Sequence, residues 1–168
     1  MKYRIIAALL CLLLVGCSAK TDSVETSAPV EAASTQIANP WKDYASLVDA
    51  EAACGLTFPM PELVADNYVA ESFRIMNGQL LEVRYRDGEF PVTIRMQAGE
   101  GQDLSGVYGE FENEQRFQVD GADIIGKYID GGVVQLISKD GYSYSLYAPN
   151  HYWGDSNVEF LQYIYDAK

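Results

Sequence analysis

Apolar residues recur at every second position along most of the chain beyond residue 68. This spacing places alternate side chains on opposite faces of an extended strand, so it predicts a sheet. In the first strand Val69, Glu71, Phe73 and Ile75 are expected to share one face. We predict strands over 69–75, 81–86, 92–96, 116–119, 122–128, 133–138 and 142–147. Asn77-Gly78 and four Asp-Gly pairs supply the positive φ that tight hairpin turns need.

Two segments show helical spacing instead. Leu47, Ala50 and Cys54 share one face of a segment that begins at Ser46, a predicted N-cap, and stops at Gly55. Near the end of the chain, Val158, Leu161 and Ile164 recur at intervals of three after Asp155-Ser156. We therefore predict helices near 46–54 and 156–165.

The short connections between strands leave no room for crossover helices, so neighbouring strands should run antiparallel. Apolar residues alternate with charged ones, as in Leu81-Glu82-Val83-Arg84-Tyr85, and this favours one covered face and one face in water. The predicted fold class is α+β: a curved antiparallel meander sheet of about six to seven strands, covered by the two short helices.

The N-terminal residues have a different character. Lys2 and Arg4 precede an apolar run from Ile5 to Val15, which is typical of a secretory signal. The run is shorter than the roughly 20 residues that a membrane-spanning helix needs. Leu14-Val15-Gly16-Cys17 resembles the lipobox of bacterial lipoproteins. This resemblance implies that Cys17 is lipidated and becomes the first residue of the mature chain.

We expect three regions on this basis: a signal peptide over 1–16, the lipidated Cys17 with a tether over 17–39, and one extracytoplasmic domain over 40–168. The tether is rich in Ser, Thr, Ala and Glu and has no aromatic residue, so it cannot bury enough apolar surface to fold. The expected location is the outer side of the cell membrane, with the lipid as the anchor.

Charge narrows the range of partners. The chain carries 24 acidic and 12 basic residues, and removing Lys2 and Arg4 with the leader takes its net charge from −12 to −14. Such a surface repels phosphate backbones, so we expect no nucleic-acid partner. Only Cys54 remains as a thiol in the mature domain, which excludes an intramolecular disulfide framework and favours a small buried side chain.

Short segments between Asn39 and Tyr147 resemble a family of bacterial extracytoplasmic domains, the domain-of-unknown-function 4367 family and its relatives. The resemblance rests on the order of these segments: Asn39-Pro40-Trp41, Leu47, Ala52-Ala53-Cys54-Gly55-Leu56, Pro61-Glu62-Leu63, Leu81-Glu82-Val83-Arg84-Tyr85, Ile94-Arg95, Asp103-Leu104-Ser105-Gly106-Val107-Tyr108 and Tyr142-Ser143-Tyr144-Ser145. It implies the same location and fold, and it carries over no catalytic or ligand residue.

Aromatic residues near the C-terminus are the best candidates for ligand contact. Tyr142 and Tyr144 alternate on one strand face, and Tyr152 and Trp153 lie in the following loop. One interpretation is a Tyr-rich core edge whose hydroxyls reach water. The other is a groove between the sheet and the C-terminal helix that binds a peptide or sugar.

Catalytic and metal motifs are weak. His151 is the only histidine, and no Gly-x-Ser-x-Gly elbow accompanies it. Asp103-Leu104-Ser105-Gly106 is more typical of a structural turn. Zinc ligands are lacking, and Glu110, Glu112 and Glu114 favour a solvated acidic face over a calcium loop, although calcium stays open. We expect no enzyme activity, no metal and no cofactor.

The function predicted from the sequence is a lipid-anchored, non-enzymatic binding or sensory module whose ligand is an unknown protein, peptide or glycan. One alternative is a lipid or hydrophobic-ligand carrier, which requires an apolar cavity in a half-barrel. The other is an envelope hydrolase, which requires a hydroxyl such as that of Ser105 near His151.

Overall fold

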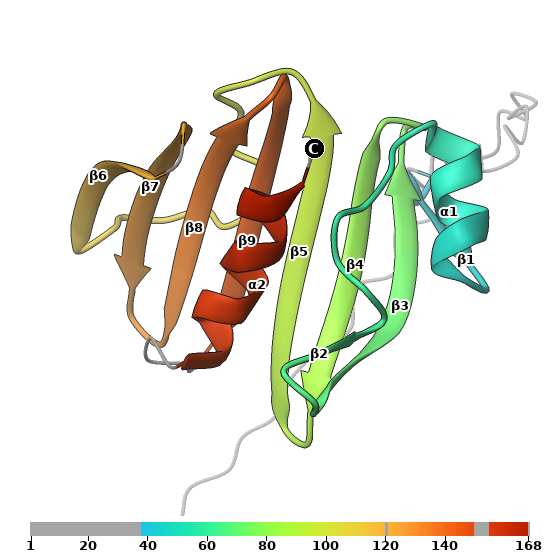
Figure 1. Ribbon diagram of the computed structural model, residues 1–168, viewed down its shortest axis with the longest axis horizontal. Coiled ribbons are helices and arrows are strands. Elements are labelled where there is room, and N and C mark those ends of the chain that lie inside the picture. The colour runs from blue at the N-terminus through green and yellow to red at the C-terminus, as the bar shows by residue number, and fades with distance from the viewer. Residues whose placement is uncertain (1–37, 120, 150–154, 168) are drawn as a thin grey trace, which may run out of the picture. The chain divides into compact units, whose positions relative to one another are not determined.

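An antiparallel sheet of nine strands forms the body of the computed structural model, which describes residues 38–119, 121–149 and 155–167 (Figure 1). The elements follow in the order β1 (Trp41–Tyr44), α1 (Leu47–Cys54), β2 (Leu63–Val64), β3 (Tyr68–Met76), β4 (Leu80–Asp87), β5 (Phe90–Ala98), β6 (Asn113–Val119), β7 (Ala122–Ile129), β8 (Gly132–Lys139), β9 (Tyr142–Pro149) and α2 (Asp155–Asp166).

The α+β class and both helices are confirmed, but the expected count of six to seven strands is wrong. The two additional strands are β1 and β2, which both pair with β3. They have only four and two residues, so neither is long enough to give a period-two signal in the sequence.

The strands do not form one continuous meander. Their order across the sheet is β1-β3-β4-β5-β9-β8-β7-β6, so two meanders, β3–β5 and β6–β9, join where β5 pairs with β9. The register of this junction places Ile94 opposite Leu146 and Met96 opposite Tyr144, and all four side chains are buried. Burial of matched apolar faces therefore holds the two meanders together.

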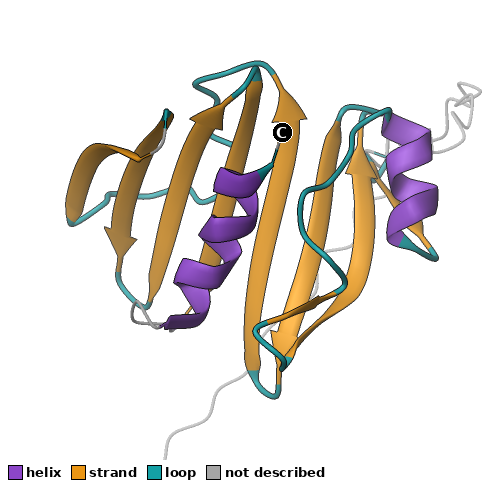
Figure 2. Ribbon diagram, viewed as in Figure 1, coloured by secondary structure: helices purple, strands orange, loops and turns teal. Residues whose placement is uncertain are grey.

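Both helices and the segment between α1 and β3 cover the same face of the sheet (Figure 2). Ser46 caps α1 as predicted: its Oγ accepts from Asp49 N–H at 3.1 Å and donates to Asp49 Oδ2 at 2.8 Å. In α2 the fully buried Phe160 packs edge-on against Tyr68 and Tyr85, with centroids 5.3 and 5.1 Å away. This covered face holds the main core.

The face predicted for the residues of β3 holds only for half of the strand. Phe73 and Ile75 are buried, but Val69 is 54% exposed and Glu71 is also exposed. The register shifts between Ala70 and Ser72, which marks a β-bulge. Because a bulge adds one residue to one strand, the side chains before it turn to the opposite face from the one that simple alternation predicts.

The second face is not left to water, which corrects the expectation of one covered and one wet face. Residues 99–112, which connect β5 to β6, cross over it. Gly101 N–H donates to Ser138 Oγ at 2.9 Å, and Gln102 N–H donates to Ser143 Oγ at 3.0 Å. Glu82, Ser143 and Ser145 are buried on this face of the sheet, and so are the apolar side chains of Leu80, Val134 and Leu136 on the strands and Leu104 in the connection.

Candidate functional site

A groove lies at the C-terminal end of α2, on the face of the sheet that the helices cover. Its volume is about 480 Å³. Four separate parts of the chain line it: the segment after α1 (Thr57, Phe58, Pro59), β5 (Met96), the β8–β9 hairpin (Lys139, Asp140, Tyr142, Tyr144) and the end of α2 (Tyr163, Asp166, Ala167). Four of these eleven side chains are aromatic, which is typical of ligand pockets in proteins.

Tyr142 and Tyr144, both predicted contact residues, line this groove. They are two residues apart on β9 and so point to the same face, with ring centroids 6.4 Å apart and planes inclined by 52°. Tyr144 is buried, and burial raises its pKa to about 12, with smaller contributions from Tyr142 and Asp140. Tyr142 is half-buried. Tyr144 therefore belongs to the hydrophobic core and forms part of the base of the groove, whereas Tyr142 is partly exposed at the groove surface.

Lys139 closes the end of α2 that faces the groove. Its Nζ donates to the carbonyls of Ile164 (3.3 Å), Tyr165 (2.7 Å) and Ala167 (2.6 Å). The same nitrogen lies 3.2 Å from Asp140 Oδ2, and the side chain is only 11% exposed. A lysine ammonium has three donors, so these contacts occupy its donors and cap the helix end where cations are favoured.

Sequence reasoning found only part of this site. Phe58, Pro59 and Met96 line the groove but carry no signal that separates them from ordinary core residues. Tyr152 and Trp153, the other predicted contact residues, lie outside the described residues, as do His151 and Cys17. The thiol of Cys54 is half-buried and donates to the Glu51 carbonyl at 3.7 Å.

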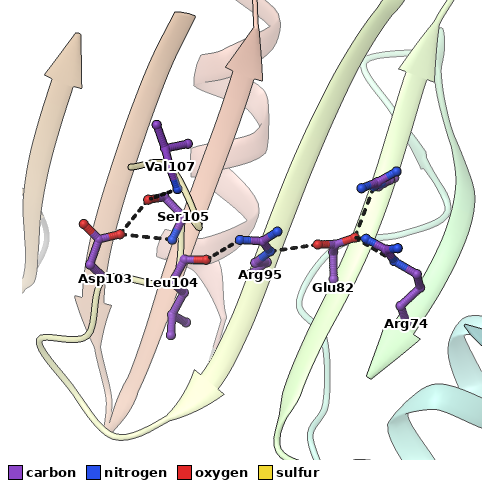
Figure 3. Close-up of polar contacts among 8 residues, drawn as sticks. Arg74, Glu82, Arg95, Asp103, Leu104, Ser105 and Val107 are labelled. Carbon is purple, nitrogen blue, oxygen red and sulfur yellow. Dashed lines mark hydrogen bonds and ion pairs between the residues drawn. The ribbon is translucent and has the colours of Figure 1, made fainter. Parts of the chain in front are cut away.

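A polar network occupies the opposite face of the sheet (Figure 3). Glu82 on β4 is fully buried there, and its carboxylate accepts from Arg74 on β3, from Arg84 at 3.1 Å and from Arg95 on β5 at 2.8 Å. The guanidinium carbons of Arg74 and Arg95 stand 4.7 and 5.5 Å from the ring centroid of Trp41. Three arginines around one carboxylate satisfy the buried charge.

This network continues into the connection between β5 and β6. Arg95 Nη1 donates to the Leu104 carbonyl at 2.8 Å. Asp103 Oδ1 accepts from Ser105 N–H at 3.0 Å and from Ser105 Oγ at 2.6 Å, and Asp103 Oδ2 accepts from Lys127 Nζ at 3.0 Å. Gly106 has φ +64°, as the predicted structural turn requires. The Ser105 hydroxyl is buried and forms its hydrogen bonds within the same turn, so Ser105 has the contacts of a structural residue.

Metal ligands do not converge in the part of the chain that the structure describes: no group of three or more His, Cys, Asp or Glu side chains is placed to hold an ion. Glu110 and Glu112 precede β6, which begins at Asn113, and Glu114 pairs with Arg116. Among the same residues, no helix is both long enough and apolar enough to cross a bilayer.

Comparison with other proteins gives no relative from which a function could be inferred. No protein-family model matches the chain, and neither the curated proteins nor the solved structures contain a match. The resemblance to the domain-of-unknown-function 4367 family therefore stays a prediction from the sequence.

Proposed function

We propose that this protein is a lipid-anchored, non-enzymatic binding module of the extracytoplasmic side of the membrane, and that its ligand binds in the groove at the end of α2. The observation that carries the proposal is the groove itself. Tyr142 and Tyr144 reach it from β9, and Tyr163 reaches it from α2. Tyrosines offer large rigid contact areas at low entropy cost, which suits recognition of a small ligand.

The anchor part of the proposal rests on the leader sequence. If Cys17 carries the lipid, the protein will fractionate with membranes from cells that produce it. Its first tryptic peptide, which spans residues 17–20, will be heavier than the unmodified peptide by the mass of the lipid on Cys17. Cys17→Ser should release the protein into the soluble fraction without altering its circular dichroism. Cys54→Ser serves as the matched control, because it removes a thiol that lies within the domain.

The carrier alternative needs space between the sheet and the helices. Phe160, Tyr68 and Tyr85 occupy the space beneath α2 with their rings in edge-on contact. An acyl chain would have to displace α2 to lie there. This packing favours a surface groove over an internal lipid cavity as the binding site.

Binding in the groove can be tested by ¹⁹F NMR on the full chain in detergent micelles with fluorotyrosine in place of tyrosine. The resonances are assigned with single Tyr→Phe variants and then followed during a screen of sugar, amide and amine fragments. We expect hits to shift Tyr142 and Tyr163 but not Tyr108, which is 96% exposed and lies outside this groove. Fragments that shift none of the groove tyrosines would contradict the proposal.

A further inference from the structure

We propose that the groove at the end of α2 recognises an organic ammonium group, a positively charged nitrogen that carries carbon substituents. This inference rests on the proposed binding function and specifies the ligand that the same groove takes. Three features of the groove carry it: the acidic residues on its rim, the occupied donors of Lys139 and the aromatic residues that line it.

The rim is negative. Asp140 and Asp166 stand on it, one from the β8–β9 turn and one from the last turn of α2. The Asp140 side chain is 68% exposed, and Asp166 is exposed as well. Asp166 accepts a hydrogen bond from the neutral amide of Gln162 at 3.0 Å, and it forms no ion pair with any residue that the structure describes. The partial negative charge at the C-terminal end of α2 faces Lys139, which donates to three carbonyls there.

The positive charge of Lys139 does not reverse this field. It is the only cationic side chain among the lining residues that the structure describes. Its ammonium contacts three carbonyls at the end of α2 and the carboxylate of Asp140. These groups therefore compensate its positive charge. An incoming anion would meet Asp166 and find no free donor on Lys139.

Aromatic residues line the same groove as the two acidic residues. Tyr142 and Tyr163 expose part of their rings to the groove, and Phe58 and Tyr144 lie deeper. The face of an aromatic ring is negative at its centre and attracts cations within about 6 Å of the centroid. A ligand that combines a positive charge with carbon substituents matches both the rings and the carboxylates, whereas a neutral sugar would use only part of this surface.

The whole domain supports the same sign of ligand. The chain has twice as many acidic as basic residues, so its field draws cations toward it and repels anions. This general attraction depends strongly on ionic strength, whereas contact with rings in a groove depends on it less. Salt dependence can therefore separate binding in the groove from a diffuse effect of net charge.

The decisive comparison uses choline and its neutral isostere 3,3-dimethylbutan-1-ol, in which carbon replaces nitrogen. Both are titrated into the full chain in non-ionic detergent micelles at 150 mM NaCl. At this concentration the Debye length is about 8 Å, so exposed charges further apart than this are largely screened. We expect choline to bind about two- to fivefold more tightly than the isostere, since a cation over an aromatic face adds that much at an exposed site. The shifted ¹⁹F resonances should be those of Tyr142 and Tyr163.

A second pair of probes distinguishes primary from quaternary ammonium groups: Nα-acetyl-lysine amide and its uncharged counterpart Nα-acetyl-norleucine amide. Tighter binding of choline assigns the groove to quaternary ammonium compounds, and tighter binding of the lysine derivative assigns it to peptide amines. Either result supports the inference, provided that the charged compound binds more tightly than its uncharged counterpart.

Variants locate the effect. Asp166→Asn and Tyr163→Leu should each weaken choline binding at least about threefold while the circular dichroism spectrum stays unchanged. Asp123→Asn is the matched control, because Asp123 is an exposed acid that lies outside this groove. Equal loss in Asp123→Asn would show that only net charge matters and would overturn the inference.

The remaining outcomes separate this inference from the proposed function. If choline and its isostere bind equally, or neither binds while sugar or amide fragments shift the groove tyrosines, the ammonium inference is wrong and the binding function stands. If no probe or fragment shifts those tyrosines, both are wrong.

Discussion

Glu82 on β4 and Arg95 on β5 lie directly opposite each other in the sheet register, and Arg95 Nε donates to Glu82 Oε2 at 2.8 Å. The Glu82 carboxylate is fully buried, and Arg95 is 16% exposed. Arg95 also donates to the Leu104 carbonyl, so this one ion pair ties the sheet to the connection that crosses its second face. The stability of that connection should therefore depend on a charged pair and not on apolar packing alone.

Replacing Glu82 should destabilise the protein strongly. Glu82→Ala leaves three arginines without their shared acceptor. We expect the free energy of unfolding to fall by about 3 kcal/mol, since removing one partner of a buried pair leaves a charge in the interior without compensation. Glu71→Ala is the matched control, because Glu71 pairs with Arg86 at the surface. Its effect should be far smaller. Urea unfolding measures both, and similar losses in the two variants would show that burial of Glu82 contributes little.

The same residue should make stability fall in acid. Burial raises the pKa of Glu82, but hydrogen bonds from Arg74 and Arg95 outweigh it and leave the pKa below its usual value. The folded protein therefore holds fewer protons than the unfolded chain as the pH drops. The stabilisation is complete above the unfolded-chain pKa of about 4.3 and is lost as the pH falls through the lower folded value.

Urea midpoints measured from pH 7 down to pH 3 test this sign. We expect the free energy of unfolding to decline below about pH 5 in the wild type and to decline less steeply in Glu82→Gln, which cannot ionise. Asp103, whose pKa is also lowered because hydrogen bonds from Ser105 and Lys127 outweigh burial, should leave some residual slope. A slope that is identical in both proteins would assign the acid sensitivity to other carboxylates.

Gly106 holds the connection close to Arg95. Its φ is +64°, and a Cβ added there would collide with the Arg95 guanidinium, which Glu82 and the Leu104 carbonyl hold in place. Gly106→Ala should therefore be more destabilising than Gly101→Ala, which has φ +74° but meets no atom within 4 Å. Gly101→Ala should cost about 1 kcal/mol for the backbone alone. Thermal melts of the pair report the difference, and equal melting temperatures would refute the close contact.

Gln135 on β8 is fully buried, and in the described part of the chain neither its Nε2 nor its Oε1 has a hydrogen-bond partner. A buried amide without partners costs about 1–3 kcal/mol, so replacing it with an apolar side chain of similar length should stabilise the fold. We expect Gln135→Met to raise the melting temperature, whereas Gln115→Met, at an exposed position two strands away, should not. A destabilised Gln135→Met would indicate a partner for the amide, such as bound water.

Local patterns in the sequence predicted the individual elements well. The cap Ser46 and the stop Gly55 bound α1, and Asp-Gly pairs mark the turns of the second meander. These signals work because capping and positive φ depend on residues next to each other in the chain. Two of the predicted contact residues, Tyr142 and Tyr144, also lie in the groove for a local reason, since alternation on β9 puts them on one face.

Other features depended on contacts that alternation does not encode. The bulge between Ala70 and Ser72 reversed the faces expected for Val69 and Glu71. Glu82 has the sequence signature of a solvent-facing position, yet it is buried among Arg74, Arg84 and Arg95 on the face that the connection over 99–112 crosses. A period of two shows that neighbouring side chains point in opposite directions, and it does not show what covers either side.

By itself, then, the sequence indicated seven of the nine strands, both helices and the turns between the longer strands, and it predicted the lipid attachment at Cys17 that awaits its own test. Only the tertiary structure decided that β9 lies beside β5 and that residues as distant as Phe58 and Tyr163 line one groove. The physical reason is the separation along the chain of the residues that interact. Hydrogen bonds within turns and helices are made between neighbours, whereas the pairing of strands and the covering of faces are chosen by burial between segments that are distant in the chain.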